Sequence, residues 1–155
     1  MKNSDRQTDA RIKPEYILST EAIVEPDMVG EDWADFELGI SLFNAGQFWE
    51  SHEAWEQVWR RHTALSRIFF QGLIQLSAAY YQINRAVYHG AVKHFNNALL
   101  KLEQFPDGFL GIKVEALCHQ ARDGLAVVID GGEEGITRFD KKKIAQIEYQ
   151  QKQSL

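Results

Sequence analysis

The chain has 155 residues, of which 45% are hydrophobic, so it is long and apolar enough to form one domain with its own core. Its formal net charge of -5 argues against a nucleic-acid partner, and its single cysteine, Cys118, excludes an internal disulfide and a cysteine-rich zinc module. No apolar stretch is long enough to span a membrane, and residues 1–16 lack the apolar core of a secretory signal, so we expect a cytoplasmic protein with no membrane partner.

The charge and turn pattern divides the chain into three parts. Residues 1–30 mix charged residues with Pro14 and Pro26, and we predict a flexible or extended N-terminal arm. A helical domain follows over residues 31–132. Residues 133–155 are charged and rich in glutamine, and they are predicted to form a polar tail or a short helix.

Within the helical domain, apolar residues recur at the three-to-four-residue spacing of amphipathic helices, and turn residues interrupt the pattern. The third helix, closed by Gly90, is apolar on most sides, which is typical of a helix at the centre of a bundle. The short turns indicate antiparallel hairpins, so the predicted fold is all-α, a compact bundle of about five helices. The predicted helices span residues 31–43, 48–61, 67–88, 91–105 and 112–129.

A weak self-similarity relates two parts of the chain when one is shifted by 44 residues, which aligns Gly46 with Gly90 and Trp55 with Leu99. A tandem repeat would make this a helical-hairpin interaction module that resembles tetratricopeptide repeats. The period is longer than in those repeats, however, and two copies are too few for a solenoid. Ordinary helical hairpins explain the pattern more simply.

A polar pair interrupts an apolar face of the second predicted helix. His52 and Glu56 lie one turn apart on the face that also carries Trp59. Because a buried carboxylate without partners is strongly destabilising, Glu56 needs partners if it is buried. Gln71 and Gln75, spaced i, i+4 on the most apolar helix, would meet this pair if the two helices pack antiparallel.

These polar residues have two interpretations. In the first, His52 and Glu56 bind a small ligand or a divalent metal ion of unknown identity, and Gln71 and Gln75 complete the shell. In a hydrolase, Glu53 or Glu56 would be the candidate base, but the sequence assigns no catalytic residue. In the second, the pair belongs to a structural hydrogen-bond network, and the chain is a noncatalytic scaffold that binds a protein partner or forms a homo-oligomer.

The other histidines, His62, His89, His94 and His119, lie near predicted helix ends or alone on helix faces, so we expect them at the surface. Cys118 is expected to be a small core residue, because no basic group is obviously placed to lower its pKa. Neither a glycine-rich phosphate loop nor a nucleophile elbow is present, which removes the usual signatures of nucleotide chemistry and acyl transfer.

Two segments resemble a known family. Residues 43–59, FNAGQFWESHEAWEQVW, resemble the signature of the "domain of unknown function 309" proteins. Residues 70–79, FQGLIQLSAA, resemble their second motif. The resemblance extends over roughly residues 32–120 and implies a compact all-helical fold.

The resemblance also implies a candidate site, because the family's His-x-x-x-Glu-x-x-Trp motif has been proposed to bind metal. Its positions in this chain are His52, Glu56 and Trp59. No activity is implied, since none is established for the family. The candidate residues of a surrounding pocket are Glu53, Trp59, Gln71 and Gln75.

Overall fold

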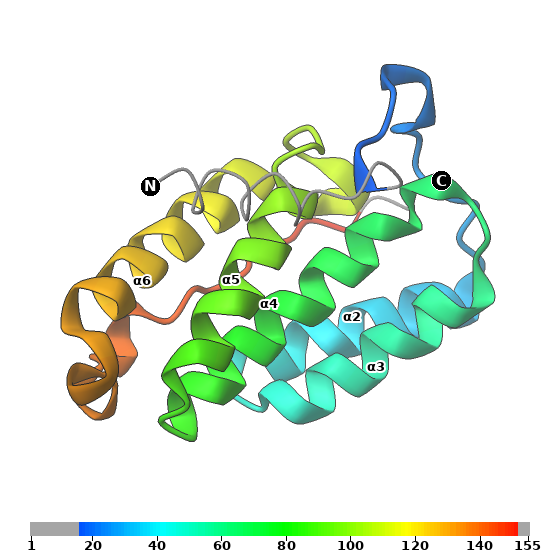
Figure 1. Ribbon diagram of the computed structural model, residues 1–155. Coiled ribbons are helices and arrows are strands. Elements are labelled where there is room, and N and C mark those ends of the chain that lie inside the picture. Colours follow the sequence, from blue (N-terminus) through cyan, green and yellow to red (C-terminus); the bar gives the residue numbers. More distant parts are fainter. Residues whose placement is uncertain (1–15, 152–155) are drawn as a thin grey trace.

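The computed structural model describes residues 16–151 of the chain, and five α-helices form the fold of this part (Figure 1). Each helix packs against the next one in the chain, and α6, α5, α4 and α3 follow one another across the bundle in Figure 1. The predicted all-α bundle of about five helices is confirmed. The helices are α2 (Gly30–Asn44), α3 (Phe48–Arg61), α4 (Ile68–Asn84), α5 (Tyr88–Leu102) and α6 (Val114–Gly135).

Helix α4 is the central helix, as its apolar sequence predicted, and it packs against both α3 and α5. Small polar groups allow α3 to approach it closely, since the buried hydroxyls of Ser51 and Ser77 are hydrogen-bonded at 2.7 Å. On α3, the indole N–H of Trp55 donates to the carbonyl oxygen of Phe36 at 3.1 Å, so even the largest buried side chain has its polar atom paired. The fully buried side chains of α4 include Phe69, Phe70, Leu73, Leu76 and Tyr80.

The turn between α4 and α5 lies earlier than the sequence predicted. Ala86 has a φ of 60°, so α4 ends at Asn84 and α5 begins at Tyr88. Gly90, which was expected to close the third helix, therefore lies in the first turn of α5. Because alanine rarely adopts the left-handed conformation, the sequence gives no signal for a turn at this position.

The two hairpins α2–α3 and α4–α5 are closed by the same turn. The N–H groups of Gln47 and Val87 each donate, at 2.9 Å, to the carbonyl oxygen five residues earlier, as in a Schellman motif. The preceding residues, Gly46 and Ala86, both have positive φ. The hairpins therefore correspond at an offset of 40 residues, from residue 47 to residue 87. The 44-residue alignment is wrong because it matched Gly46 with Gly90 instead of Ala86.

Of the predicted N-terminal arm, residues 1–15 lie outside the described residues. Residues 17–29 contain one short 3-10 helix, Thr20–Ala22, and otherwise have no regular structure. The side chain of Gln104, just beyond α5, fixes the start of this segment. Its amide nitrogen donates to the carbonyl oxygen of Tyr16 at 2.5 Å, and its amide oxygen accepts from the N–H of Leu18 at 2.8 Å.

The predicted break at residues 130–132 occurs at Gly132, where φ is 67°, although helical structure continues to Gly135. Beyond it, the described part of the predicted polar tail contains two 3-10 helices, Ile136–Arg138 and Lys141–Lys143, followed by an extended stretch.

This extended stretch packs on the bundle, unlike a solvated tail. Ala145 and Ile147 are buried. The side chain of Asn44 accepts from the N–H of Ile147 at 2.7 Å and donates to its carbonyl oxygen at 3.0 Å. The side chain of Gln120 pairs with the N–H and carbonyl oxygen of Gln146 in the same way. The sequence pattern missed this segment because side-chain amides hold it, without helical periodicity.

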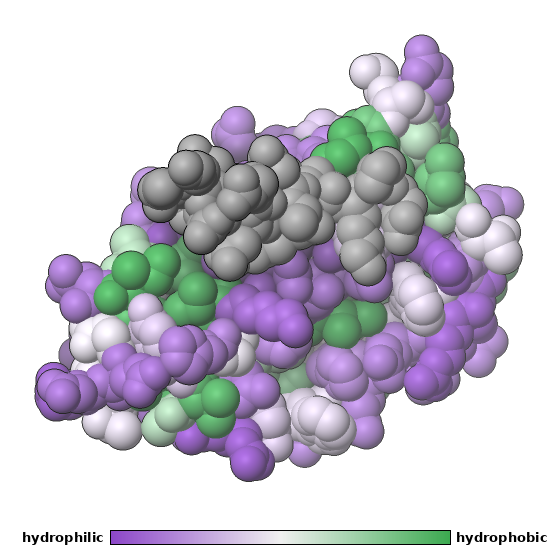
Figure 2. All heavy atoms as spheres, in the orientation of Figure 1, coloured by the Kyte–Doolittle hydropathy of each residue, from purple (hydrophilic) through white to green (hydrophobic). Residues whose placement is uncertain are grey.

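Among the described residues on the face that Figure 2 shows, hydrophilic ones predominate, interrupted by smaller hydrophobic areas. Within residues 16–151, no helix combines the length and the apolar character needed to cross a bilayer.

Candidate functional site

His52 and Glu56 lie at the edge of the buried face of α3. The centre of that face is formed by residues such as Ser51 and Trp55, each one residue earlier in the helix. Since one residue corresponds to a rotation of about 100° around a helix axis, the side chains of His52 and Glu56 point to the border between core and solvent. Their exposed fractions are 21% and 32%, so the sequence was wrong to place them in the middle of the core face.

The two predicted site residues do interact. Nε2 of His52 lies 3.5 Å from Oε2 of Glu56, and the other carboxylate oxygen of Glu56 accepts from Arg60 at 3.3 Å. The imidazole also stacks on Trp49, with ring centroids 5.0 Å apart. Nδ1 of His52 is buried and has no hydrogen-bond partner among the described residues.

A second histidine shares this feature. Nδ1 of His94, on α5, is also buried without a hydrogen-bond partner in the described part of the chain. Burial lowers the pKa of His94, and the charges of Lys93 and His52 lower it further. His94 is thus partly buried within electrostatic reach of His52, not a surface residue as the sequence suggested.

Gln71 and Gln75, the predicted polar residues of α4, have different surroundings. The side-chain oxygen of Gln75 accepts from Nζ of Lys101 at 2.9 Å, which joins α4 to α5. Gln71 lines a cavity of about 290 Å³ together with Trp59 and Arg67. The structure therefore brings Gln71 next to the predicted residue Trp59, whereas Gln75 pairs with a residue that the sequence did not single out.

The remaining predicted residues have surroundings of their own. The ring of Trp59 is covered by the guanidinium of Arg67, 4.4 Å from the ring centroid. Glu53 is exposed on the solvent side of α3. Cys118 is buried, which raises the pKa of its thiol to about 11, so it is a neutral core residue at physiological pH, as expected.

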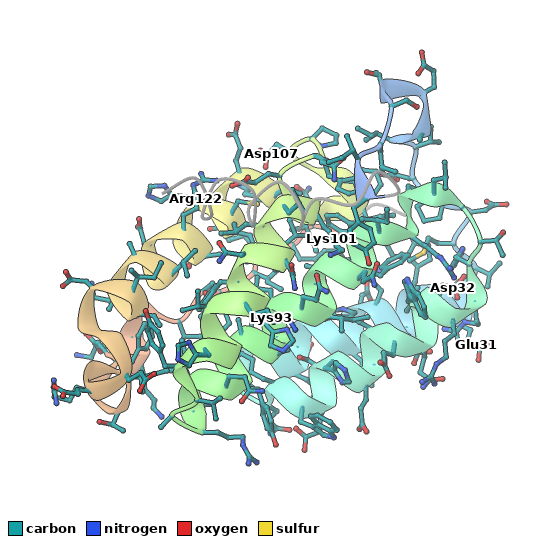
Figure 3. All side chains as sticks on the ribbon, viewed as in Figure 1. Glu31, Asp32, Lys93, Lys101, Asp107 and Arg122 are labelled. Carbon is teal, nitrogen blue, oxygen red and sulfur yellow. The ribbon has the colours of Figure 1, made fainter. Side chains whose placement is uncertain are left out.

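An ionic cluster at one end of the bundle was missed by the sequence analysis. The carboxylate of Asp32, near the start of α2, accepts from Nε of Arg61 at 2.7 Å and lies 3.0 Å from Nε2 of His62. Figure 3 shows Asp32 beside Glu31 at this end. Although burial opposes ionisation, hydrogen bonds from Arg61, from the Val29 N–H and from His62 lower the pKa of Asp32.

Two of the missed residues had a detectable signal. His94 and Lys101 are seven residues apart, which places both on one edge of α5 beside its buried residues Phe95 and Leu102. The Asp32 cluster gave none, because its members are about 30 residues apart and meet only when α2 and α3 pair.

Within the described residues, no group of three or more His, Cys, Asp or Glu side chains is arranged to hold a metal ion. The His52–Glu56 pair supplies two such groups, and the charge of His52 acts on a third, His94. Neutral imidazoles and a carboxylate are suitable donors for first-row divalent metals.

Residues 36–94 match a family described as "Domain of unknown function (DUF309)". Over this segment, the chain is similar to the DUF309 family. The family resemblance inferred from residues 43–59 and 70–79 is thus confirmed, over a shorter segment than 32–120. The DUF309 segment contains all of α3 and α4 and ends at His94. A comparison with curated proteins found no match.

Proposed function

We propose that this protein binds a divalent transition-metal ion through His52 and Glu56 on α3 and His94 on α5. The observation that carries the proposal is the pair of buried Nδ1 atoms, on His52 and His94, that have no hydrogen-bond partner in the described part of the chain. Buried polar atoms are nearly always paired, so each of these two nitrogens favours a bound ligand.

The charge state of the site supports a metal ion as that ligand. A metal binds the neutral form of imidazole, and the lowered pKa of His94 keeps this ring neutral at physiological pH. The carboxylate of Glu56 lies 3.5 Å from Nε2 of His52, so it adds negative charge beside this ring. With at most three protein ligands, water would complete the coordination shell, and the ion would exchange readily.

The alternative interpretation is a structural hydrogen-bond network. Such a network would pair both nitrogens of His52, but only Nε2 faces a partner among the described residues. A scaffold function rests on a different observation, the half-exposed side chain of Trp49 beside Tyr81. A cytoplasmic location and the absence of a nucleic-acid partner stay predictions from composition and charge.

Cobalt titration of the full-length, tag-free protein tests the proposal, because Co²⁺ with nitrogen and oxygen ligands has a visible absorption band. The chain offers a matched control. His119 and Asp123 have the same i, i+4 spacing, with 3.4 Å between Nε2 and Oδ2, but both side chains are about 70% exposed. We expect His52→Ala and His94→Ala each to weaken binding at least about tenfold, and His119→Ala to change it less than about twofold.

Three results would overturn the proposal. One is the absence of a stoichiometric cobalt band, with no effect of chelator on the unfolding temperature. Another is equal loss of binding in His119→Ala and His52→Ala, which would indicate adventitious binding to exposed histidines. The third is unchanged binding in His94→Ala, which would remove α5 from the site. Without metal binding, a scaffold that presents Trp49 to a partner is the next function to test.

A further inference from the structure

The two nitrogens of the His52 ring have different surroundings. Nε2 lies 3.5 Å from Oε2 of Glu56, whereas Nδ1 is buried and has no hydrogen-bond partner among the described residues. In a neutral imidazole one nitrogen carries a proton and the other a lone pair, and the neighbours of the ring decide which is which. Because a metal ion binds the lone pair, these surroundings decide which atom of His52 is available as a ligand.

The carboxylate of Glu56 favours a proton on Nε2. With the proton there, the positive end of the N–H dipole is the part of the ring nearest to the negative charge. A lone pair on Nε2 would face the carboxylate and be repelled by it. The lone pair of His52 is therefore on Nδ1, the buried nitrogen.

Both carboxylate oxygens of Glu56 already have a partner. Oε2 faces Nε2 of His52, and Oε1 accepts from Nη2 of Arg60 at 3.3 Å. The two nitrogens of an imidazole point away from each other, so an ion bound to Nδ1 would lie at a different edge of the ring from this carboxylate. In this arrangement Glu56 contacts the ring of His52 and not the ion.

The indole of Trp49 supports the same orientation of the ring. It stacks on the imidazole of His52 with ring centroids 5.0 Å apart and planes inclined at 27°. Trp49 also contacts Tyr81 of α4, with ring centroids 5.4 Å apart, which connects the stacked pair to the neighbouring helix. A ring that is covered on one face turns less freely, so Nδ1 stays the buried nitrogen.

We propose that His52 binds the metal ion through Nδ1 and that Glu56 is a positioning residue, which acts on the ion through the ring of His52. This inference rests on the metal site proposed above and assigns the roles of two of its residues. Histidine ligands commonly direct their other ring N–H at a carboxylate, which orients the ring and makes the ligating nitrogen a stronger donor. Glu56 thus strengthens binding without touching the ion.

NMR of the ring nitrogens of His52 tests the assignment, with the full-length, tag-free protein labelled with ¹⁵N. Spectra are recorded without metal at about pH 8, above the ordinary pKa of histidine, and then during titration with Zn²⁺. In the metal-free protein we expect the proton on Nε2 and the lone pair on Nδ1. Zinc should shift the Nδ1 signal, while Nε2 keeps its proton.

Glu56→Gln separates a positioning role from a ligand role, because it keeps the size of the side chain and removes its charge. We expect it to weaken zinc binding at least about tenfold. At saturation with Co²⁺, its visible band should match that of the wild type, since the ligands of the ion are the same. Glu53→Gln is the matched control, the same change at an exposed residue of α3, and should alter the affinity less than about twofold.

Four results would overturn this inference alone. They are a proton on Nδ1 in the metal-free protein, loss of the Nε2 proton when zinc binds, a changed cobalt band in saturated Glu56→Gln, and equal zinc affinity in Glu56→Gln and the wild type. The changed band would make Glu56 a ligand. If zinc alters neither nitrogen of His52, the metal site itself is refuted, and the roles assigned to His52 and Glu56 are refuted with it.

Discussion

The indole of Trp55 fills the space that a side chain at Gly39 would need. A Cβ atom added at Gly39 would overlap three atoms of the indole ring, including Nε1. Trp55 cannot move away freely, because it is fully buried and its N–H is bonded to the carbonyl oxygen of Phe36. The glycine in the middle of α2 is therefore a packing requirement and sets how closely α2 and α3 approach.

We predict that Gly39→Ala destabilises the protein by at least about 1–3 kcal/mol, despite the higher helix propensity of alanine. Urea unfolding monitored by circular dichroism measures the effect. Gly30→Ala is the control, since a Cβ there meets no atom within 4 Å. If Gly39→Ala were as stable as Gly30→Ala, the rigid packing of Trp55 would be refuted.

The second hairpin suggests a rescue of this variant. At the 40-residue offset, Gly39 and Trp55 correspond to Ala79 and Phe95. The second hairpin thus has alanine in place of glycine and the smaller ring of phenylalanine in place of the indole. We expect Trp55→Phe to be less destabilising in the Gly39→Ala background than in the wild type. A double-mutant cycle on unfolding free energies measures this coupling. Strictly additive effects would contradict the correspondence.

The fold was predictable where local signals decide it. Amphipathic periodicity indicated the helices, and the Asn44–Gly46 turn was recognised by its glycine. The turn at Ala86 was not, because its left-handed conformation is imposed by the packing of α4 on α5 and not by a residue that prefers it. Tertiary contacts outweigh backbone preference at this position.

The candidate site was predictable only within one helix. The i, i+4 spacing correctly placed His52 beside Glu56, since both lie on α3. Gln75 was expected to meet this pair but is bonded to Lys101 of α5 instead. Periodicity identifies the residues at the edge of α4 but not which neighbouring helix each edge faces. The influence of His52 on His94 was missed for the same reason, since it depends on the packing of α5.

The Asp32 cluster is predicted to stabilise the pairing of α2 and α3. Asp32→Asn removes a buried charge that accepts from Arg61 and faces His62, so we expect a loss of about 2–3 kcal/mol in unfolding free energy. Asp35→Asn is the matched control. Asp35 also accepts from Arg61 at 2.7 Å but is 28% exposed, so its loss should amount to less than about 1 kcal/mol. Equal losses in the two variants would contradict a special role for the buried carboxylate.

The same cluster predicts part of the acid sensitivity. Because the pKa of Asp32 is lowered in the folded state, its contribution is fully present above the pKa of an unfolded carboxyl, about 3.9, and disappears as the pH falls through the lower folded pKa. Asp32→Asn should therefore lose less stability than the wild type below about pH 4. Parallel acid-unfolding curves for the two proteins would refute this.

His94 should produce a second pH dependence. Its pKa is lowered in the folded state, first by burial and then by Lys93 and His52, so the unfolded chain binds the proton more readily. Metal-free protein should lose stability as the pH falls below the unfolded histidine pKa of about 6.5, until the folded pKa is passed. His94→Gln should remove this component and His119→Gln, at an exposed site, should not. Urea unfolding between about pH 7 and pH 5 measures this dependence. If the unfolding free energy changed with pH equally in all three proteins, His94 would be excluded as the cause.

The packed C-terminal stretch leads to a last prediction. Ile147 is 4% exposed, and its backbone N–H and carbonyl oxygen are both hydrogen-bonded to the side chain of Asn44. Its side chain is therefore fixed against the core. Ile147→Ala should cost about 2–4 kcal/mol in unfolding free energy, as a buried large-to-small substitution does. Ile129→Ala makes the same chemical change at a side chain that is 50% exposed, and its effect should stay near 0.5 kcal/mol. If both variants unfolded at the same urea concentration, residues 144–149 would contribute no more than a solvated tail, whereas a clear difference would make this stretch part of the core that holds α2 against α6.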